Sequence, residues 1–133
     1  MIVLRADGVL LIRRARDPGQ GRWALPGGAQ RVGETVEQAG RRELREETGL
    51  EVGALRFVGY VDAIEADADG RARFHYTILD LAARWRSGEP VADDDASEAA
   101  FVAVASLSAL GVSDATLRLV DLARADAWPG EDV

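Results

Sequence analysis

One stretch of the chain, residues 28–50, constrains the fold more than any other. It reads GAQRVGETVEQAGRRELREETGL, a glycine-containing loop that runs into a segment of helix-forming residues. Thr35 suits the N-cap position, Gln38 stands three residues later where a capping box needs it, and Gly49 supplies a left-handed stop. The stretch therefore predicts a loop followed by an α-helix over residues 36–48.

One face of this predicted helix combines apolar and acidic residues. At about 100° per residue, Val36 and Leu44 share an arc that should face the core. Glu43 and Glu47 fall in the same arc, one turn apart, and Glu46 lies at its edge. Like charges at this spacing repel each other, and a helix C-terminus already carries partial negative charge. Nothing in the helix offsets these costs, but a bound cation would.

A divalent metal ion is the cation that these residues favour. Hard ions such as Mg²⁺ bind oxygen ligands, and carboxylates at i, i+3 and i+4 reach one point. Glu43, Glu46 and Glu47 are therefore predicted metal ligands, with Mn²⁺ as a second candidate ion. The alternative is an ordinary solvated, glutamate-rich helix face, which the apolar neighbours of these residues disfavour.

The same stretch matches a family signature. The specified positions are Gly28, Glu34, Arg42, Glu43, Leu44, Glu46, Glu47, Gly49 and Leu50. This pattern resembles the Nudix box, and the chain is identified as a member of the Nudix hydrolases. The resemblance implies an α/β fold, with a mixed β-sheet sandwiched between helices, in a single domain over residues 1–133.

The resemblance also implies a reaction and further site residues. Nudix hydrolases cleave the diphosphate linkage of a nucleoside diphosphate linked to another group, with Mg²⁺ as cofactor and a small-molecule nucleotide as substrate. In the family the carbonyl at the position of Gly28 binds metal. Glu46, Glu47 and Glu98 are the implied catalytic carboxylates, and which of them is the base stays open. Arg42 is four residues from Glu46, so we expect it to orient that glutamate.

Five residues outside the acidic face are predicted to contact substrate. Guanidinium groups bind phosphate oxygens bidentately, and Arg14 is similar in position to the family's phosphate-contacting arginine. Arg31 stands where many relatives carry glutamate, and its charge is either directed at a phosphate or exposed. Trp23 is expected to pack beneath the loop, with base stacking as its second role. His75 and Tyr76 lie on opposite faces of a predicted strand as pocket candidates.

The remaining segments complete a mixed α/β pattern. Predicted strands cover residues 2–4, 9–12, 55–64, 72–81 and 99–104. Asp7-Gly8 is a hairpin signal between the first two strands. Residues 84–97, which contain three consecutive aspartates from Asp93, read as an exposed, solvated loop. A C-terminal helix over residues 114–125 is predicted to bury Leu117, Val120, Leu122 and Ala123.

Composition excludes several classes of protein. Sixteen basic and 23 acidic residues give a net charge of −7, which argues against a nucleic-acid or anionic-membrane surface. The sequence contains no cysteine and one histidine, which excludes thiolate and histidine metal clusters. No apolar run is long enough to span a membrane, so a cytoplasmic location is expected.

Three questions stay open at this level. The substrate is either ADP-ribose or a related dinucleotide, or a nucleoside triphosphate. The chain is either a monomer or a homodimer. A non-catalytic module that senses a nucleotide or binds a partner is the alternative to an enzyme, although such modules typically have eroded boxes. A Nudix isomerase acting on isopentenyl diphosphate is disfavoured, because that activity relies on a cysteine.

Overall fold

Six strands pair into one mixed β-sheet. In chain order the elements are β1 (Ile2–Arg5), β2 (Gly8–Arg14), β3 (Trp23–Ala24), α1 (Val36–Thr48), β4 (Arg56–Ala66), β5 (Ala72–Arg84), β6 (Ala96–Val102), two 3₁₀ turns (Val104–Ser106 and Ser108–Leu110) and α2 (Asp114–Ala125). The computed structural model describes residues 1–125, so the last eight residues of the expected domain lie outside the described part. No helix within these residues is long and apolar enough to cross a membrane.

The sheet is antiparallel except at its centre. Its strand order is β3-β2-β1-β5-β4, and β6 also pairs with β2. The β1 and β5 strands run parallel, with Ile2 opposite Ala82. All the other strand pairs are antiparallel. The predicted mixed sheet is therefore confirmed.

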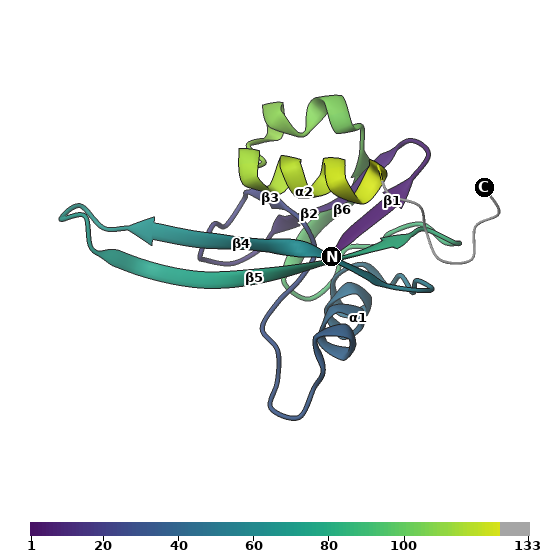
Figure 1. Ribbon diagram of the computed structural model, residues 1–133, viewed down its shortest axis with the longest axis horizontal. Coiled ribbons are helices and arrows are strands. Elements are labelled where there is room, and N and C mark those ends of the chain that lie inside the picture. The colour runs from purple at the N-terminus through teal and green to yellow at the C-terminus, as the bar shows by residue number, and fades with distance from the viewer. Residues whose placement is uncertain (126–133) are drawn as a thin grey trace.

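The two faces of the sheet bury two separate apolar clusters. Side chains that alternate along a strand point to opposite faces, so Leu11 joins one cluster and Leu10 the other. The first cluster contains Leu119 and Val120 of α2, and the second contains Leu44 of α1. Figure 1 shows the two helices on opposite sides of the sheet. This is the predicted α/β/α sandwich.

Helix α1 forms as its sequence signals predict. Thr35 is the N-cap, its side chain accepts a hydrogen bond from the Gln38 amide, and the Gln38 side chain completes the capping box. Gly49 ends the helix in the left-handed conformation at φ 71°. The predicted bounds and both caps are confirmed.

Three local predictions differ from the structure. The turn between β1 and β2 consists of Ala6 and Asp7, because Gly8 already pairs with Arg5. The last strand begins at Ala96 rather than at residue 99, since it pairs with β2 over more of its length. On α2, Leu119 takes the buried position, whereas Leu122 is 52% exposed.

The β4 and β5 strands form a long hairpin that projects from the rest of the molecule (Figure 1). Both strands are longer than predicted, and they end at Ala66 and Arg84. The neighbouring strand β1 pairs with β5 only at the last residues of β5, residues 82–84. Beyond them, no other strand of residues 1–125 pairs with the hairpin. We call residues 60–66 and 72–79 the arm.

Candidate functional site

The carboxylate of Glu47 is buried in the last turn of α1. Its residue is only 2% exposed and lies on the same helix face as the fully buried Leu44. An ionised carboxylate in such surroundings is costly unless it is paired or bound to a cation. The apolar face of α1 therefore contains a carboxylate, as the sequence predicts.

The two oxygens of Glu47 have different surroundings. The amide of Gly27 donates a hydrogen bond to Oε1 across 3.2 Å. The second oxygen, Oε2, is buried and has no hydrogen-bond partner among the described residues. Burial is the main reason that the pKa of Glu47 is raised to about 8; the Gly27 amide lowers this pKa, and the neighbouring Glu43 raises it. Glu47 thus presents one free oxygen beside a second carboxylate.

Gly28 brings the backbone of the loop directly against Glu43. A Cβ atom added at Gly28 would overlap the carboxyl group of Glu43, so no larger residue fits without a shift. At Gly27, by contrast, an added Cβ would meet no atom within 4 Å. The glycine at position 28 therefore lets the loop approach the carboxylates closely.

These residues fit a divalent cation. A free buried oxygen on Glu47, the adjacent Glu43 carboxylate and the close backbone at Gly28 form an all-oxygen donor set of the kind that Mg²⁺ and Mn²⁺ bind. Across residues 1–125, no three acidic, histidine or cysteine side chains are already arranged around one metal position. Glu46, the third predicted ligand, forms ion pairs with Arg42 at 3.2 Å and with Arg31 at 3.7 Å.

Arg42 joins the loop to the helix. Its guanidinium donates to both carboxylate oxygens of Glu34, at 2.6 and 2.9 Å, and to the carbonyl of Ala29 at 2.9 Å. It also contacts Glu43 at 2.8 Å and Glu46 at 3.2 Å. The hydrogen bond from Arg42 is the main reason that the pKa of Glu34 is lowered to about 2. Arg42 therefore orients carboxylates, as predicted, and also fixes the loop.

Glu98 lies on the other face of the sheet from α1. It pairs with Arg13 in the strand register and forms an ion pair with it at 3.4 Å. Alternation puts Arg13 on the side of Leu11, which packs in the cluster of α2. The structure therefore does not place Glu98 among the carboxylates of α1.

The predicted phosphate-binding arginines point in different directions. The Nε atom of Arg14 donates to the carbonyl of Pro18 at 2.6 Å, so this side chain curls over its own loop. Arg31 is beside the carboxylates through its ion pair with Glu46, and its side chain is 66% exposed. Of the two, Arg31 is the nearer to the acidic face of α1.

The three ring side chains that were predicted to contact substrate lie in different parts of the fold. Trp23 is half-buried and packs against the cluster of α2, whereas its expected position beneath the loop stays a prediction. His75 and Tyr76 lie in the arm on opposite faces, as predicted, and both are exposed. Tyr76 stacks on Phe74 with ring centroids 6.3 Å apart. None of the three belongs to the buried part of the site.

Sequence reasoning missed two acidic positions near the site. Asp80 of β5 is only 2% exposed, lies 3.6 Å from the amino group of Met1, and has its pKa raised by burial. The same amino group donates to the carbonyl of Pro26 at the start of the loop. An aspartate between Leu79 and Leu81 in an apolar strand was the available signal.

The second missed position is in the acidic loop before β6. The amide of Asp93 donates to the carbonyl of Glu47 at 3.1 Å, and Val91 donates to that of Thr48 at 2.9 Å. This loop therefore runs along the C-terminal end of α1 rather than through solvent alone. The sequence offered no periodic pattern there that would reveal the contact.

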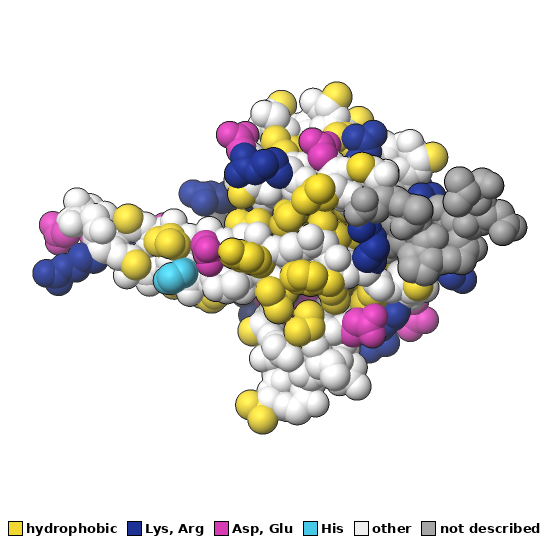
Figure 2. All heavy atoms as spheres, viewed as in Figure 1, with side chains coloured by type: hydrophobic (Ala, Val, Ile, Leu, Met, Phe, Trp, Pro, Cys, Tyr) yellow, Lys and Arg dark blue, Asp and Glu magenta, His cyan; other side chains and the backbone are white. Residues whose placement is uncertain are grey.

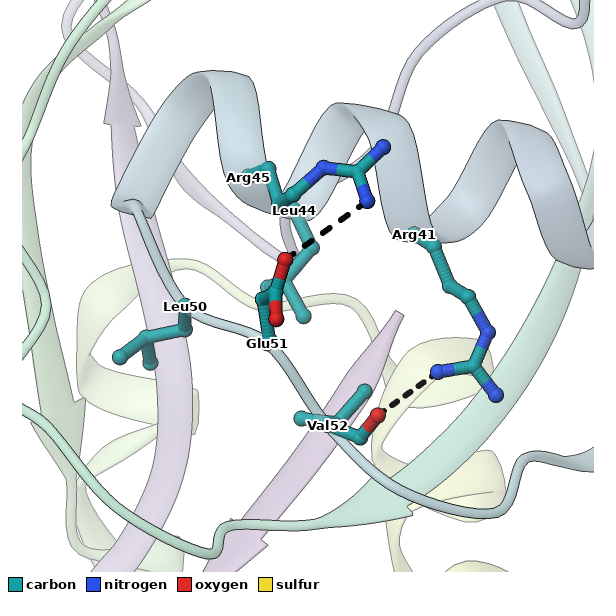
Figure 3. Close-up of a pocket in the computed structure, with 6 residues that line it drawn as sticks. All are labelled: Arg41, Leu44, Arg45, Leu50, Glu51 and Val52. Carbon is teal, nitrogen blue, oxygen red and sulfur yellow. Dashed lines mark hydrogen bonds and ion pairs between the residues drawn. The ribbon is translucent and has the colours of Figure 1, made fainter.

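Two hollows among the described residues are lined by residues other than Glu43, Glu46 and Glu47. One is a hollow of about 140 Å³ beside α1, lined by Arg41, Leu44, Arg45, Leu50, Glu51 and Val52. Figure 3 shows Arg45 turned toward Glu51, and Arg41 bonded to the carbonyl of Val52 at 2.7 Å. These contacts tie the helix to the segment that follows it.

Comparison with known proteins agrees with this geometry. The family model described as NUDIX domain matches residues 1–122. The ADP-ribose pyrophosphatase of Methanocaldococcus jannaschii is 40% identical over 100 residues, which cover 75% of this chain and 57% of that protein. The nucleoside triphosphatase NudI of an Enterobacter species is 34% identical over 122 residues, 86% of each chain. The chain thus spans little more than half the length of its archaeal relative.

A solved structure shows the same arrangement of elements. The crystal structure of a MutT NUDIX hydrolase from Burkholderia pseudomallei matches with a TM-score of 0.75 and 31% identity. The match covers 91% of this chain and 92% of the other. The similarity therefore extends over the sheet and both helices, well beyond the loop and α1.

Proposed function

The chain belongs to the NUDIX domain family, and from this premise we propose that it hydrolyses the diphosphate linkage of a nucleoside diphosphate joined to another group. The observation that carries the proposal is the free buried oxygen of Glu47 beside Glu43, at a glycine loop. Such an arrangement is costly for folding alone. It suits a site that binds a cation and a phosphate together.

A divalent ion, Mg²⁺ or Mn²⁺, is the proposed cofactor. Glu43 and Glu47 would hold it with the carbonyl of Gly28, and Glu46 would act either as a further ligand or as the base. When bound, the ion neutralises phosphate charge and lowers the pKa of a water molecule. The protein's own contribution is to fix the two carboxylates against the loop.

The remaining residues hold the substrate and handle the proton. Arg42 keeps the loop and three glutamates in place through its guanidinium contacts. Glu46 is our first candidate for the base that accepts the proton of the attacking water, because its side chain is one-third exposed at the edge of the site. Glu98 is the second candidate and is disfavoured by its place on the other face of the sheet.

Contacts with the rest of the substrate are proposed for five side chains. Arg31 is placed to bind a phosphate once it leaves Glu46, and Arg14 is a second phosphate ligand if it turns away from Pro18. Trp23, His75 and Tyr76 are proposed to contact the base or sugar, with Trp23 limited by its packing.

Two substrate classes follow from the relatives. One relative is named an ADP-ribose pyrophosphatase and another a nucleoside triphosphatase. Both kinds of molecule contain a phosphoric anhydride next to a nucleoside, which is the chemistry that this site suits. A cytoplasmic enzyme without nucleic-acid or membrane partners stays a prediction of the sequence.

The experiment that tests the proposal is a substrate panel. Release of AMP or phosphate is measured from ADP-ribose, NADH, dinucleoside polyphosphates, and canonical and oxidised nucleoside triphosphates, each with Mg²⁺, Mn²⁺ or EDTA. Turnover of one class that EDTA abolishes supports the enzyme and names its substrate. Nucleotide binding without turnover under all conditions would favour a sensing module instead.

A further inference from the structure

Residues 91–95, which precede β6, run along the C-terminal end of α1, and we call them the strap. The last carbonyl groups of a helix have no hydrogen-bond partner within the helix. In this helix the carbonyl of Glu47 accepts from the amide of Asp93 at 3.1 Å. The carbonyl of Thr48 accepts from the amide of Val91 at 2.9 Å. The strap therefore supplies partners to the very turn that carries Glu47.

The other end of the strap is bonded to the loop that follows β2. The carbonyl of Asp95 accepts a hydrogen bond from the amide of Ala15 at 2.8 Å. The carboxylate of Asp95 also lies 3.2 Å from the guanidinium of Arg16, but both side chains are more than half exposed, so this ion pair contributes little. Ala15 directly follows Arg14, a proposed phosphate contact. The strap thus joins the end of α1 that carries Glu47 to the arginine-containing loop.

A tight turn that begins at Asp93 gives the strap its shape. The carbonyl of Asp93 accepts from the amide of Ala96 at 3.0 Å, and its side-chain Oδ1 accepts from the amide of Asp94 at 2.8 Å. Asp94 has a φ of 52°, and within residues 1–125 it is the one residue other than glycine with a positive φ. This conformation is costly for a residue with a side chain, so the turn needs the bond from Asp93.

The other side chains of the strap contribute little to holding it in place. Val91 is 70% exposed, and the three aspartates are exposed as well. The aspartates are near the C-terminal end of α1, which carries partial negative charge, so their charges do not favour this position. The position of the strap therefore depends on the hydrogen bonds of its backbone and on the side-chain oxygen of Asp93.

We propose that Asp93 is a positioning residue for the candidate metal ligand Glu47. Its side chain fixes the turn, the turn aims the Asp93 amide at the carbonyl of Glu47, and this bond fixes the backbone from which the buried carboxylate projects. Outer contacts of this kind orient metal ligands. The inference rests on the proposed function, because it takes Glu47 as a ligand of the metal.

The first test measures Mn²⁺ binding by titration calorimetry. Asp93→Ala removes the side-chain acceptor and should weaken the Kd by about tenfold, at the low end of the effect of outer contacts. Asp93→Asn keeps an oxygen for the Asp94 amide and should bind Mn²⁺ like wild type.

Asp67→Ala is the matched control for the loss of an aspartate that holds a turn. The Oδ1 atom of Asp67 accepts from the amides of Asp69 and Arg71, at 2.9 and 3.0 Å, in the turn between the two strands of the arm. Figure 2 shows the arm projecting away from the body of the protein. We expect Asp67→Ala to leave the Kd for Mn²⁺ unchanged.

Asp94 tests the same turn independently. Asp94→Val places a β-branched residue at a positive φ and should open the turn, whereas Asp94→Gly suits this conformation and should preserve it. Amide hydrogen exchange of the metal-free protein reports the opening directly. The amides of Val91 and Asp93 should exchange faster in Asp93→Ala and in Asp94→Val, while amides in the interior of β2 should exchange as in wild type.

The outcomes separate this inference from the proposed function. A wild-type protein that binds no Mn²⁺ would overturn the metal assignment, and the inference would fail with it. Wild-type affinity in Asp93→Ala, or unchanged exchange of the Asp93 amide in that variant, would overturn the positioning role alone. Equal loss of affinity in Asp93→Asn and Asp93→Ala would also overturn it, because the charge of the carboxylate would then act rather than its hydrogen bond.

Discussion

The amide of Gly27 holds one oxygen of Glu47 across 3.2 Å and leaves the other oxygen of that carboxylate buried and free. These residues are twenty positions apart, so the loop must fold back on α1 to make the contact. The free oxygen then faces the neighbouring Glu43. Five predictions rest on this pair and on the contacts around it.

Substitution of Glu47 by glutamine should remove most turnover while the protein stays folded. Glutamine keeps an oxygen for the Gly27 amide but loses the charge that binds a cation, so we expect kcat to fall on the order of 10²-fold or more. Thermal melting should show no loss of stability. The control is Glu51→Gln, since Glu51 is exposed and forms only a 3.8 Å ion pair with Arg45. Near-normal turnover by Glu47→Gln would refute the metal assignment.

Stability should depend on pH and on metal together. The pKa of Glu47 is raised to about 8 from its ordinary value of 4.5. A raised pKa means that this group's contribution to stability is fully present below pH 4.5 and is lost as pH rises through about 8. A divalent ion binds the ionised form, so Mg²⁺ should raise the melting temperature more at pH 9 than at pH 6.

Melting curves with Mg²⁺ or EDTA at several pH values measure this effect. The Glu47→Gln variant provides the control, and its curves should lose both the pH dependence in this range and most of the response to metal. Equal stabilisation of wild type at both pH values would contradict the role given to Glu47.

A methyl group at position 28 should damage the site, whereas one at position 27 should not. In Gly28→Ala the new Cβ overlaps the carboxyl group of Glu43 and must displace it. We expect at least about a tenfold loss in kcat, equivalent to about 1.4 kcal/mol in the barrier. Gly27→Ala is the matched control because its Cβ meets no atom within 4 Å. Equal activity of the two variants would contradict the close contact.

Replacement of Arg42 by lysine should loosen the loop without unfolding the sheet. Lysine cannot donate to both oxygens of Glu34 and to the Ala29 carbonyl together. We expect faster limited proteolysis within residues 28–34 and a lower kcat. Arg45→Lys is the control, because the Arg45 side chain is 54% exposed. Unchanged protease sensitivity in Arg42→Lys would show that the loop is held by other contacts.

Acid should act on the same contact. Because Arg42 lowers the pKa of Glu34 to about 2, the stabilisation from this pair is present above the ordinary pKa of 4.5 and is lost as pH falls toward 2. Proteolysis of the loop by an acid protease should therefore accelerate over this range in wild type. In Arg42→Lys the acceleration should begin at higher pH.

The sequence predicted the parts of the site that depend on local rules. The bounds of α1 depend on Thr35, Gln38 and Gly49, whose capping chemistry operates within a few residues. The buried position of Glu47 follows from helical periodicity alone. These features can be predicted from the sequence because each depends on residues that are close together in the chain.

Features that depend on strand register and long-range contact were not predicted. The face on which Glu98 lies depends on the register in which β6 pairs with β2. The contact of Asp93 with Glu47 joins two residues that are 46 positions apart, so it depends on how the intervening strands β4 and β5 fold. Asp80 is buried because other elements pack over it, although its apolar neighbours gave a signal.

The contacts among Gly27, Gly28, Glu34, Arg42, Glu43 and Glu47 have a consequence for how such a protein is altered. All of them are made inside one continuous segment, and they join the loop of that segment to its helix α1. The candidate metal ligands therefore lie in one sequence segment that can be exchanged as a unit between related domains. Trp23 and the arm, which includes His75, lie outside that unit, so the proposed nucleoside contacts can be changed there without altering the candidate metal ligands.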